Sequence, residues 1–239
     1  MQGLLLYVKI RTNFGILELF FYLMFLFSFL SQPIIFLAWL VAMMVSVTLH
    51  EFAHALSAYA QGDATAKYSG RLTLNPFKHL DLWGTIMLLV VGFGWGKPVP
   101  YNPYNLRNQK WGPSLVALAG PGANLVLIIF FGVILKSLVL GGVLGPGNML
   151  YILMEMIVVL NAVWFVFNLI PIPPLDGSKL FFALLPSRLD HLKASFTVRG
   201  PLILISLIIL DRLLNLSLFT SLFNLIIRAV EVIFGLSLI

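Results

Sequence analysis

The chain has 239 residues, of which 60% are hydrophobic and only 10% are charged. About a quarter of the residues in an average soluble domain are charged, so this composition excludes an ordinary water-exposed surface and indicates a protein of the lipid bilayer. The net charge of +6 comes from scattered Lys and Arg without a basic run that includes aromatic residues, so we expect no nucleic-acid partner.

Six apolar runs predict transmembrane helices, because a helix that crosses a hydrocarbon core of about 30 Å needs about 20 residues. In chain order they cover about 14–31, 33–60, 113–140, 148–170, 200–216 and 217–238. A shorter run, 82–95, is followed by several glycines and prolines, which favour a re-entrant hairpin or loop near 82–100. No linker separates a soluble domain from these runs, so we predict one all-α polytopic membrane domain over 1–239.

The distribution of Lys and Arg predicts how the helices are oriented. Basic residues precede the first run, and others lie between the second and third runs and between the fourth and fifth. The connections 31–33 and 141–147 carry no charge. Cytoplasmic loops are enriched in Lys and Arg, so we expect a multi-pass protein of the cell membrane with both termini in the cytoplasm.

The second run carries a candidate metal site. His50 and His54 are four residues apart, so both imidazoles project from one helical face and can bind one metal ion, with Glu51 as candidate general base. An accidental polar patch is the alternative, but ionisable side chains within a membrane span are costly and usually functional. A helix that begins at Pro33 rises about 25 Å by His50, which predicts a site inside the membrane and nearer the cytoplasmic face.

A catalytic zinc ion usually has three protein ligands and a water, so two histidines require a third ligand. The chain has no cysteine, which leaves His, Asp and Glu. We expect Asp176, because the prolines within 171–174 end the fourth helix and an irregular backbone can point the carboxylate into the bundle. A cap on the following helix is the alternative role, and Glu155 should lie near the opposite leaflet. The other candidates occur in polar loops, where we expect solvated side chains: His79, Asp81 and His191.

Together these residues resemble the site-2 protease family of intramembrane metalloproteases. The sequence 50–54 resembles the family's first motif, the stretch 168–177 (Asn-Leu-Ile-Pro-Ile-Pro-Pro-Leu-Asp-Gly) resembles its second, and the similarity covers about 40–180. No stretch resembles the PDZ or CBS domains of larger members, so the chain resembles a compact member. The resemblance implies cleavage of a transmembrane protein substrate, water activated by Glu51, and one zinc ion with three ligands: His50, His54 and Asp176.

Two further stretches resemble parts of this family. The stretch 120–124 (Gly-Pro-Gly-Ala-Asn) resembles the motif of its central helix, which implies that Asn124 helps to hold the substrate carbonyl. Close packing of the small residues is the alternative, and we expect Asn161 to make an interhelical hydrogen bond. The stretch 93–100 resembles a membrane-associated hairpin, which implies an unpaired backbone edge for an extended substrate; a plain interfacial turn is the alternative.

Two other functions stay open at this point. A membrane zinc transporter also uses intramembrane His and Asp, but it would not require Glu51 directly after the first histidine, and it needs a second ligand set across the bilayer. A catalytically inactive family member that binds membrane helices is the other alternative. Zinc flux in proteoliposomes without proteolysis would favour transport, whereas loss of an intact membrane substrate would favour the protease.

Overall fold

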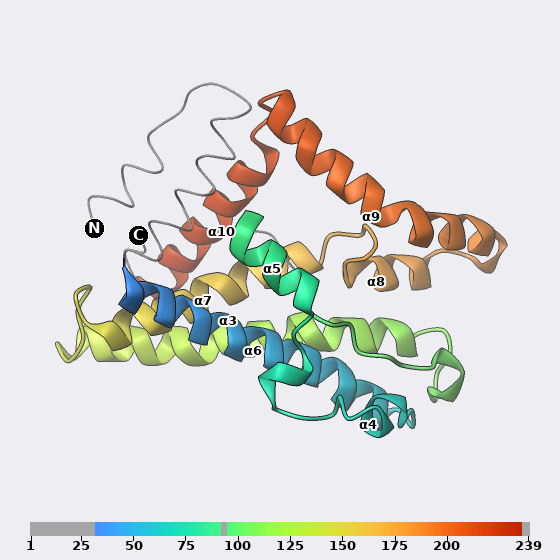
Figure 1. Cartoon of the computed structure of the whole chain (residues 1–239), viewed down its shortest axis with the longest axis horizontal. Coiled ribbons are helices and arrows are strands. Elements are labelled where there is room, and N and C mark those ends of the chain that lie inside the picture. The colour runs from blue at the N-terminus through green and yellow to red at the C-terminus, as the bar shows by residue number, and fades with distance from the viewer. Residues whose placement is uncertain (1–31, 92–94, 236–239) are drawn as a thin grey trace.

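The computed structural model describes residues 32–91 and 95–235, so the first predicted span, 14–31, lies outside the described residues. The long helices are α3 (Pro33–Ala60), α6 (Gly112–Leu140), α7 (Met149–Asn168), α9 (Asp190–Leu213) and α10 (Leu218–Phe234). Shorter elements connect them: α4 (Thr65–Tyr68), η1 (Pro76–Lys78), α5 (Leu82–Val91), η2 (Pro103–Asn105), α8 (Gly177–Leu184) and η3 (Ser187–Leu189). Figure 1 shows this helical architecture.

The predicted all-α polytopic architecture is confirmed. Within the described residues, four helices are long and apolar enough to cross a membrane: Pro33–Ala60, Gly112–Leu140, Met149–Asn168 and Ser187–Asp211. The sixth predicted run corresponds to α10, which has 17 residues and is shorter than these four. The fifth run was predicted from 200, but α9 begins at Asp190, because its first turns are polar and an apolar count does not detect them.

The helix ends follow from local sequence. Pro33 and Pro113 occupy the first turns of α3 and α6, where a backbone N–H has no helical partner to lose. Asn148 caps α7 by accepting a hydrogen bond from the Leu150 N–H at 2.8 Å. These signals explain why α3, α6 and α7 begin within one residue of the predicted runs.

The helices α3, α6 and α7 pack against one another, and α10 packs mainly against α7. The largest buried cluster joins α6, α7 and α10: Ile128, Leu135, Tyr151, Val158, Ala162, Ile226, Val230 and Phe234. Small residues on α3, among them Ala55 and Ala58, are fully buried, and small side chains let membrane helices approach closely. This close approach between α3 and α6 positions the polar residues described below.

The region predicted as a re-entrant hairpin or loop forms the short helix α5, which projects away from the α3–α6 pair (Figure 1), and an extended segment, 95–100. A single antiparallel bridge joins Leu80 and Gly96 among the described residues. The predicted hairpin turn includes residues 92–94, which lie outside the described residues.

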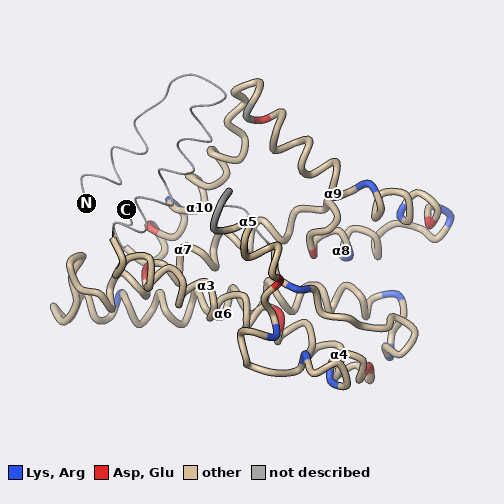
Figure 2. Tube along the Cα trace, in the orientation of Figure 1, with Lys and Arg blue, Asp and Glu red and all other residues tan. Residues whose placement is uncertain are grey.

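Lys and Arg gather at one end of the bundle, where α3 ends and where α6 and α9 begin (Figure 2). The clustering agrees with the sequence pattern from which a cytoplasmic side was predicted. The placement of this end on the cytoplasmic side stays a prediction.

Candidate metal centre

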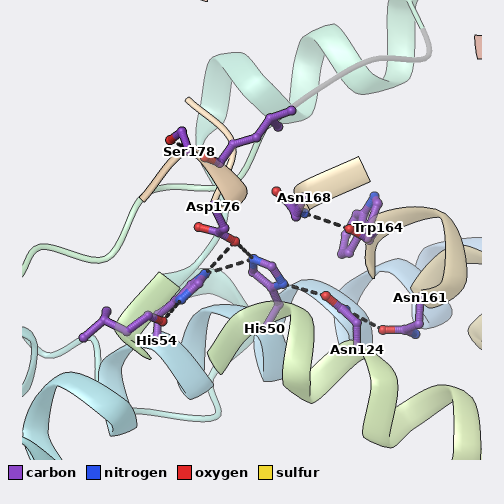
Figure 3. A network of polar contacts seen from close by, with 10 residues as sticks. His50, His54, Asn124, Asn161, Trp164, Asn168, Asp176 and Ser178 are labelled. Atoms are coloured by element: carbon purple, nitrogen blue, oxygen red, sulfur yellow. Dashed lines mark hydrogen bonds and ion pairs between the residues drawn. The ribbon is translucent and has the colours of Figure 1, made fainter. Parts of the chain in front are cut away.

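Two imidazoles from α3 and one carboxylate from the loop after α7 converge beside α6. His50 and His54 are buried on α3, with their Nε2 atoms 3.0 Å apart and their rings edge to face at a centroid distance of 4.6 Å. Asp176 lies between α7 and α8, and its Oδ2 atom is 3.3 Å from the Nε2 atom of each histidine. Figure 3 shows the carboxylate above the two rings. The three predicted ligands are therefore brought together, with their ligand atoms within 4.8 Å of one another.

The loop after α7 carries Asp176 to this position because it folds tightly against its surroundings. An ideal Cβ at Gly177 would lie 2.8 Å from the Ile170 carbonyl oxygen, so a larger residue there would push the loop away. Gly200 on α9 similarly places an ideal Cβ 2.6 Å from the Pro173 carbonyl oxygen. The carboxylate of Asp176 makes no capping hydrogen bond to α8, so the alternative role as a helix cap is not observed.

The other nitrogen of each imidazole fixes which atom faces Asp176. His54 Nδ1 is 2.7 Å from the Val116 carbonyl oxygen, and His50 Nδ1 is 2.6 Å from Asn124 Oδ1. Oxygens of this kind only accept hydrogen bonds, so each Nδ1 carries the hydrogen and donates it. When such an imidazole is neutral, as a metal ligand must be, its Nε2 lone pair faces the carboxylate.

Two imidazole nitrogens and one carboxylate oxygen that converge in this way are an arrangement that a cation stabilises. The Oδ2 atom of Asp176 is buried and, apart from its contacts with the two imidazoles, has no polar partner in the part of the chain that the structure describes. Zinc accepts imidazole nitrogen and carboxylate oxygen ligands, and a hydrogen bond from the second ring nitrogen is the usual support for such a histidine. The residues of this site therefore fit one zinc ion.

Asn124 lies beside His50 on the facing helix α6. Its carboxamide oxygen accepts the His50 hydrogen bond, and its amide nitrogen donates to Asn161 Oδ1 on α7 at 2.6 Å. Asn161 thus makes the interhelical hydrogen bond expected from the sequence. Contact between Asn124 and a substrate carbonyl stays a prediction.

Gly120 lets the backbone of α6 pass directly over the two imidazoles. An ideal Cβ at this position would lie 2.5 Å from His54 Cε1 and 2.6 Å from His50 Cε1, which is closer than real Cβ atoms approach other heavy atoms. A glycine is therefore required here by the distance between α6 and the rings.

Glu51 follows His50 on α3 and is partly buried. Its Oε2 atom has no hydrogen-bond partner among the described residues, and its Oε1 atom lies 3.4 Å from an ideal Cβ at Gly96. The extended segment 95–100 therefore passes beside Glu51. Hydrogen bonds from the buried Arg71 guanidinium to the carbonyl oxygens of Lys97 and Pro98 hold this segment in place.

Sequence reasoning did not find the residues that support this segment. His79 was expected to be solvated, but this expectation is wrong: the side chain is fully buried, with Nε2 2.8 Å from the Thr73 carbonyl oxygen, and its backbone oxygen accepts from the Lys97 N–H. Burial lowers the pKa of Arg71, and the negative charge of Glu51 opposes this shift. The partners of Arg71 are 26 and 27 residues away in the chain, so no local spacing reveals them.

The remaining rival ligands lie outside the site. Asp81 accepts a hydrogen bond from the Gly84 N–H at the start of α5, and His191 is exposed. Glu155 is buried on α7, but the group of possible ligands found among the described residues does not include it.

Comparisons with known proteins give a consistent result. The family model described as "Peptidase family M50" matches residues 38–152 and 147–210. The chain is 43% identical over 162 residues to "Putative zinc metalloprotease YwhC" of Bacillus subtilis. This match covers 66% of this chain and 74% of that protein. It is 31% and 34% identical to proteins named "Putative zinc metalloprotease Rip2" from Mycolicibacterium smegmatis and Mycobacterium tuberculosis. These matches cover 62% and 56% of this chain, and 57% and 52% of those proteins. No solved structure matches the chain.

Proposed function

The chain belongs to peptidase family M50, the site-2 protease family, and from this membership we propose that it hydrolyses peptide bonds of membrane-spanning protein substrates. The observation that carries the proposal is the convergence of three ligand atoms beside Glu51 on a helix long and apolar enough to cross a membrane. The family and the names of the relatives imply a zinc metalloprotease. The proposed ligands are His50, His54 and Asp176.

The proposed chemistry divides between the ion and Glu51. When bound, zinc polarises a carbonyl and makes water a stronger nucleophile at neutral pH. Glu51 accepts a proton from the attacking water while the new C–O bond forms, and it delivers the proton to the amine nitrogen while the C–N bond breaks. The unpaired Oε2 atom of Glu51 supports this role, because no hydrogen bond from a described residue has to be broken first.

We propose that the segment 95–100 aligns the substrate beside Glu51. A helical substrate has its carbonyl groups tied up in its own hydrogen bonds, so the part to be cleaved must become extended. The extended conformation of 95–100 and its attachment through Arg71 provide a fixed backbone along which such a segment can pair. We further propose that both termini, and the end of α3 nearer the site, face the cytoplasm.

The structure favours catalysis over zinc transport. Among the described residues, His50, His54 and Asp176 are the single group of three possible ligands whose atoms converge. A transport path needs further ligands along the membrane normal. The hydrolase therefore remains the better explanation.

The decisive experiment compares wild type with Glu51→Gln in detergent and in proteoliposomes. Gln cannot accept the proton, so we expect cleavage of a membrane-helix substrate to fall by about 10²–10⁴-fold. Zinc content measured by atomic absorption should stay at the wild-type value, because Glu51 is not one of the three proposed ligands. Glu231→Gln on α10 is the matched control and should cleave at the wild-type rate. Zinc flux through wild type and Glu51→Gln, together with no cleavage by wild type, would instead establish a transporter.

A further inference from the structure

We propose that Ser46 and Asn161 are positioning residues that select the tautomer of His50, acting through Asn124. The two metal-facing histidines are supported differently. His54 donates to a backbone carbonyl, which only accepts, so its tautomer is fixed directly. His50 contacts a carboxamide, which can present either an oxygen or an NH₂ group. This inference rests on the proposed metal site but not on proteolysis.

The orientation of the Asn124 carboxamide decides the chemistry of His50. With the oxygen toward His50, Nδ1 carries the hydrogen and the Nε2 lone pair faces Asp176. With the amide flipped, the NH₂ group would favour a bare Nδ1 and place the hydrogen on Nε2, where it blocks metal binding. Something beyond Asn124 must therefore hold the amide in one orientation.

A chain of buried hydrogen bonds supplies this constraint. Asn124 donates to Asn161 Oδ1 at 2.6 Å, and Asn161 Nδ2 donates to Ser46 Oγ and to the Ile157 carbonyl oxygen, each at 2.7 Å. The Ser46 hydroxyl donates to the Ala42 carbonyl oxygen at 2.6 Å. Figure 3 shows the part of this chain from His50 through Asn124 to Asn161.

The direction of every bond follows from the two backbone carbonyls. The Ala42 oxygen takes the Ser46 hydrogen, which leaves the Ser46 oxygen as an acceptor. Ser46 and the Ile157 oxygen then take both hydrogens of the Asn161 amide, so the Asn161 oxygen must face Asn124. Asn124 must consequently turn its NH₂ group toward Asn161 and its oxygen toward His50.

Burial makes this selection effective. Ser46, Asn124 and Asn161 are all 0% exposed, so water does not offer alternative partners. Flipping Asn124 would oppose its oxygen to Asn161 Oδ1, acceptor to acceptor, and would make His50 move its hydrogen from Nδ1 to Nε2. Ser46 lies one helical turn before His50, so the chain starts and ends on α3 after passing through α7 and α6.

Two substitutions of Asn161 separate hydrogen-bond direction from packing. Leu is larger than Asn but has the same branching at Cγ and no acceptor, so Asn161→Leu frees Asn124 to rotate. Asp presents an oxygen to Asn124 whether or not it is protonated, so Asn161→Asp retains the orientation. We expect Asn161→Leu to weaken zinc affinity by about 10–100-fold and Asn161→Asp to retain most of it. Chelator competition in detergent measures both affinities without a protease assay.

The tautomer has its own spectroscopic signature. The chain has four histidines, so ¹⁵N-histidine NMR of the zinc-free protein can resolve His50. We expect Nδ1 of His50 to carry a hydrogen in wild type and Asn161→Asp, whether or not Asp176 also keeps one on Nε2, and to lose that hydrogen in part in Asn161→Leu. Wild-type affinity with an unchanged His50 signal in Asn161→Leu would overturn the proposal. Equal losses of affinity in the Asp and Leu variants would also overturn it, because that result indicates packing.

Serine variants test the far end of the chain. Ser46→Ala removes one acceptor of the Asn161 amide and should weaken zinc affinity in the same direction as Asn161→Leu, by less, because the Ile157 oxygen remains. Ser137→Ala is the matched control, since Ser137 also donates to a carbonyl four residues earlier but does not contact this chain. Equal zinc affinities for the two alanine variants would remove Ser46 from the proposal.

Discussion

Gly120 illustrates how one side-chain atom can decide whether the site forms. A methyl group there would lie against both imidazoles, so we expect Gly120→Ala to displace the rings or α6 and to lower zinc affinity at least about 10-fold. Zinc content after dialysis against a weak chelator provides the measurement. Gly122→Ala is the control, because an ideal Cβ at Gly122 meets nothing within 4 Å. A Gly120→Ala protein with full zinc content would show that the rings can move without loss of binding.

At this scale the sequence reveals residues whose chemistry depends on short spacing. His50, Glu51 and His54 were identified because one helical turn places two imidazoles on one face. Asp176 was identified because prolines mark an irregular backbone. The contact between Asn124 and His50 was not predicted, since the residue that faces Asn124 depends on how α6 crosses α3.

At the scale of elements, the apolar runs predicted the cores of the helices but not all of their ends. The ends of α3 and α7 have proline or asparagine signals, and they fall within two residues of the prediction. The start of α9 was missed by ten residues because its polar turns extend beyond the apolar run. The position of α10 against α6 and α7 depends on packing, including the ring of Phe234 over Gly132, which no periodicity indicates.

Asp63 joins two connections outside the membrane-spanning helices. Its buried carboxylate accepts hydrogen bonds from the backbone N–H groups of Thr65 and Asn102 and from the side chains of Thr65 and Asn105. Burial raises the pKa of this carboxyl group, but the hydrogen bonds outweigh burial and hold the pKa below its ordinary value of 3.8. The charged carboxylate therefore stabilises the fold above about pH 4, and this contribution is lost as the pH falls through the folded-state pKa.

We expect Asp63→Asn to unfold at a lower temperature than wild type at about pH 7, because an amide offers one acceptor oxygen instead of two. The difference should shrink below about pH 4, where protonation removes the advantage of the carboxylate. Thermal unfolding in detergent across this pH range measures it. Asp190→Asn is a control at neutral pH, since Asp190 is exposed and its ion pair with Lys193 contributes little. Identical unfolding temperatures for Asp63→Asn and wild type at every pH would contradict this account.

At the scale of the whole molecule, composition predicted a lipid environment and an all-α fold class, because hydropathy counts residues without reference to their packing. It did not predict that three helices would exchange hydrogen bonds through a buried polar chain, or that Arg71 would hold the segment 95–100 beside Glu51. Such contacts join residues far apart in the chain and become visible once the helices are assembled.

The order of the proposed ligands along the chain has a consequence for biosynthesis. His50 and His54 are made first, and α6 and α7 follow before Asp176 completes the set. A ribosome-bound chain therefore cannot hold the metal with all three ligands until both later helices have been synthesised. Metal loading becomes a late event that reports successful insertion of the preceding helices.

This order can be tested by dividing the gene within the connection 141–147, most of which is exposed. We expect neither half alone to bind zinc tightly, since the first lacks Asp176 and the second lacks both histidines. Co-expressed halves should recover zinc binding, because the packing of α7 on α3 and α6 does not require a covalent link. Tight zinc binding by the first half alone, measured on the purified fragment, would show that the metal can arrive before the bundle is complete.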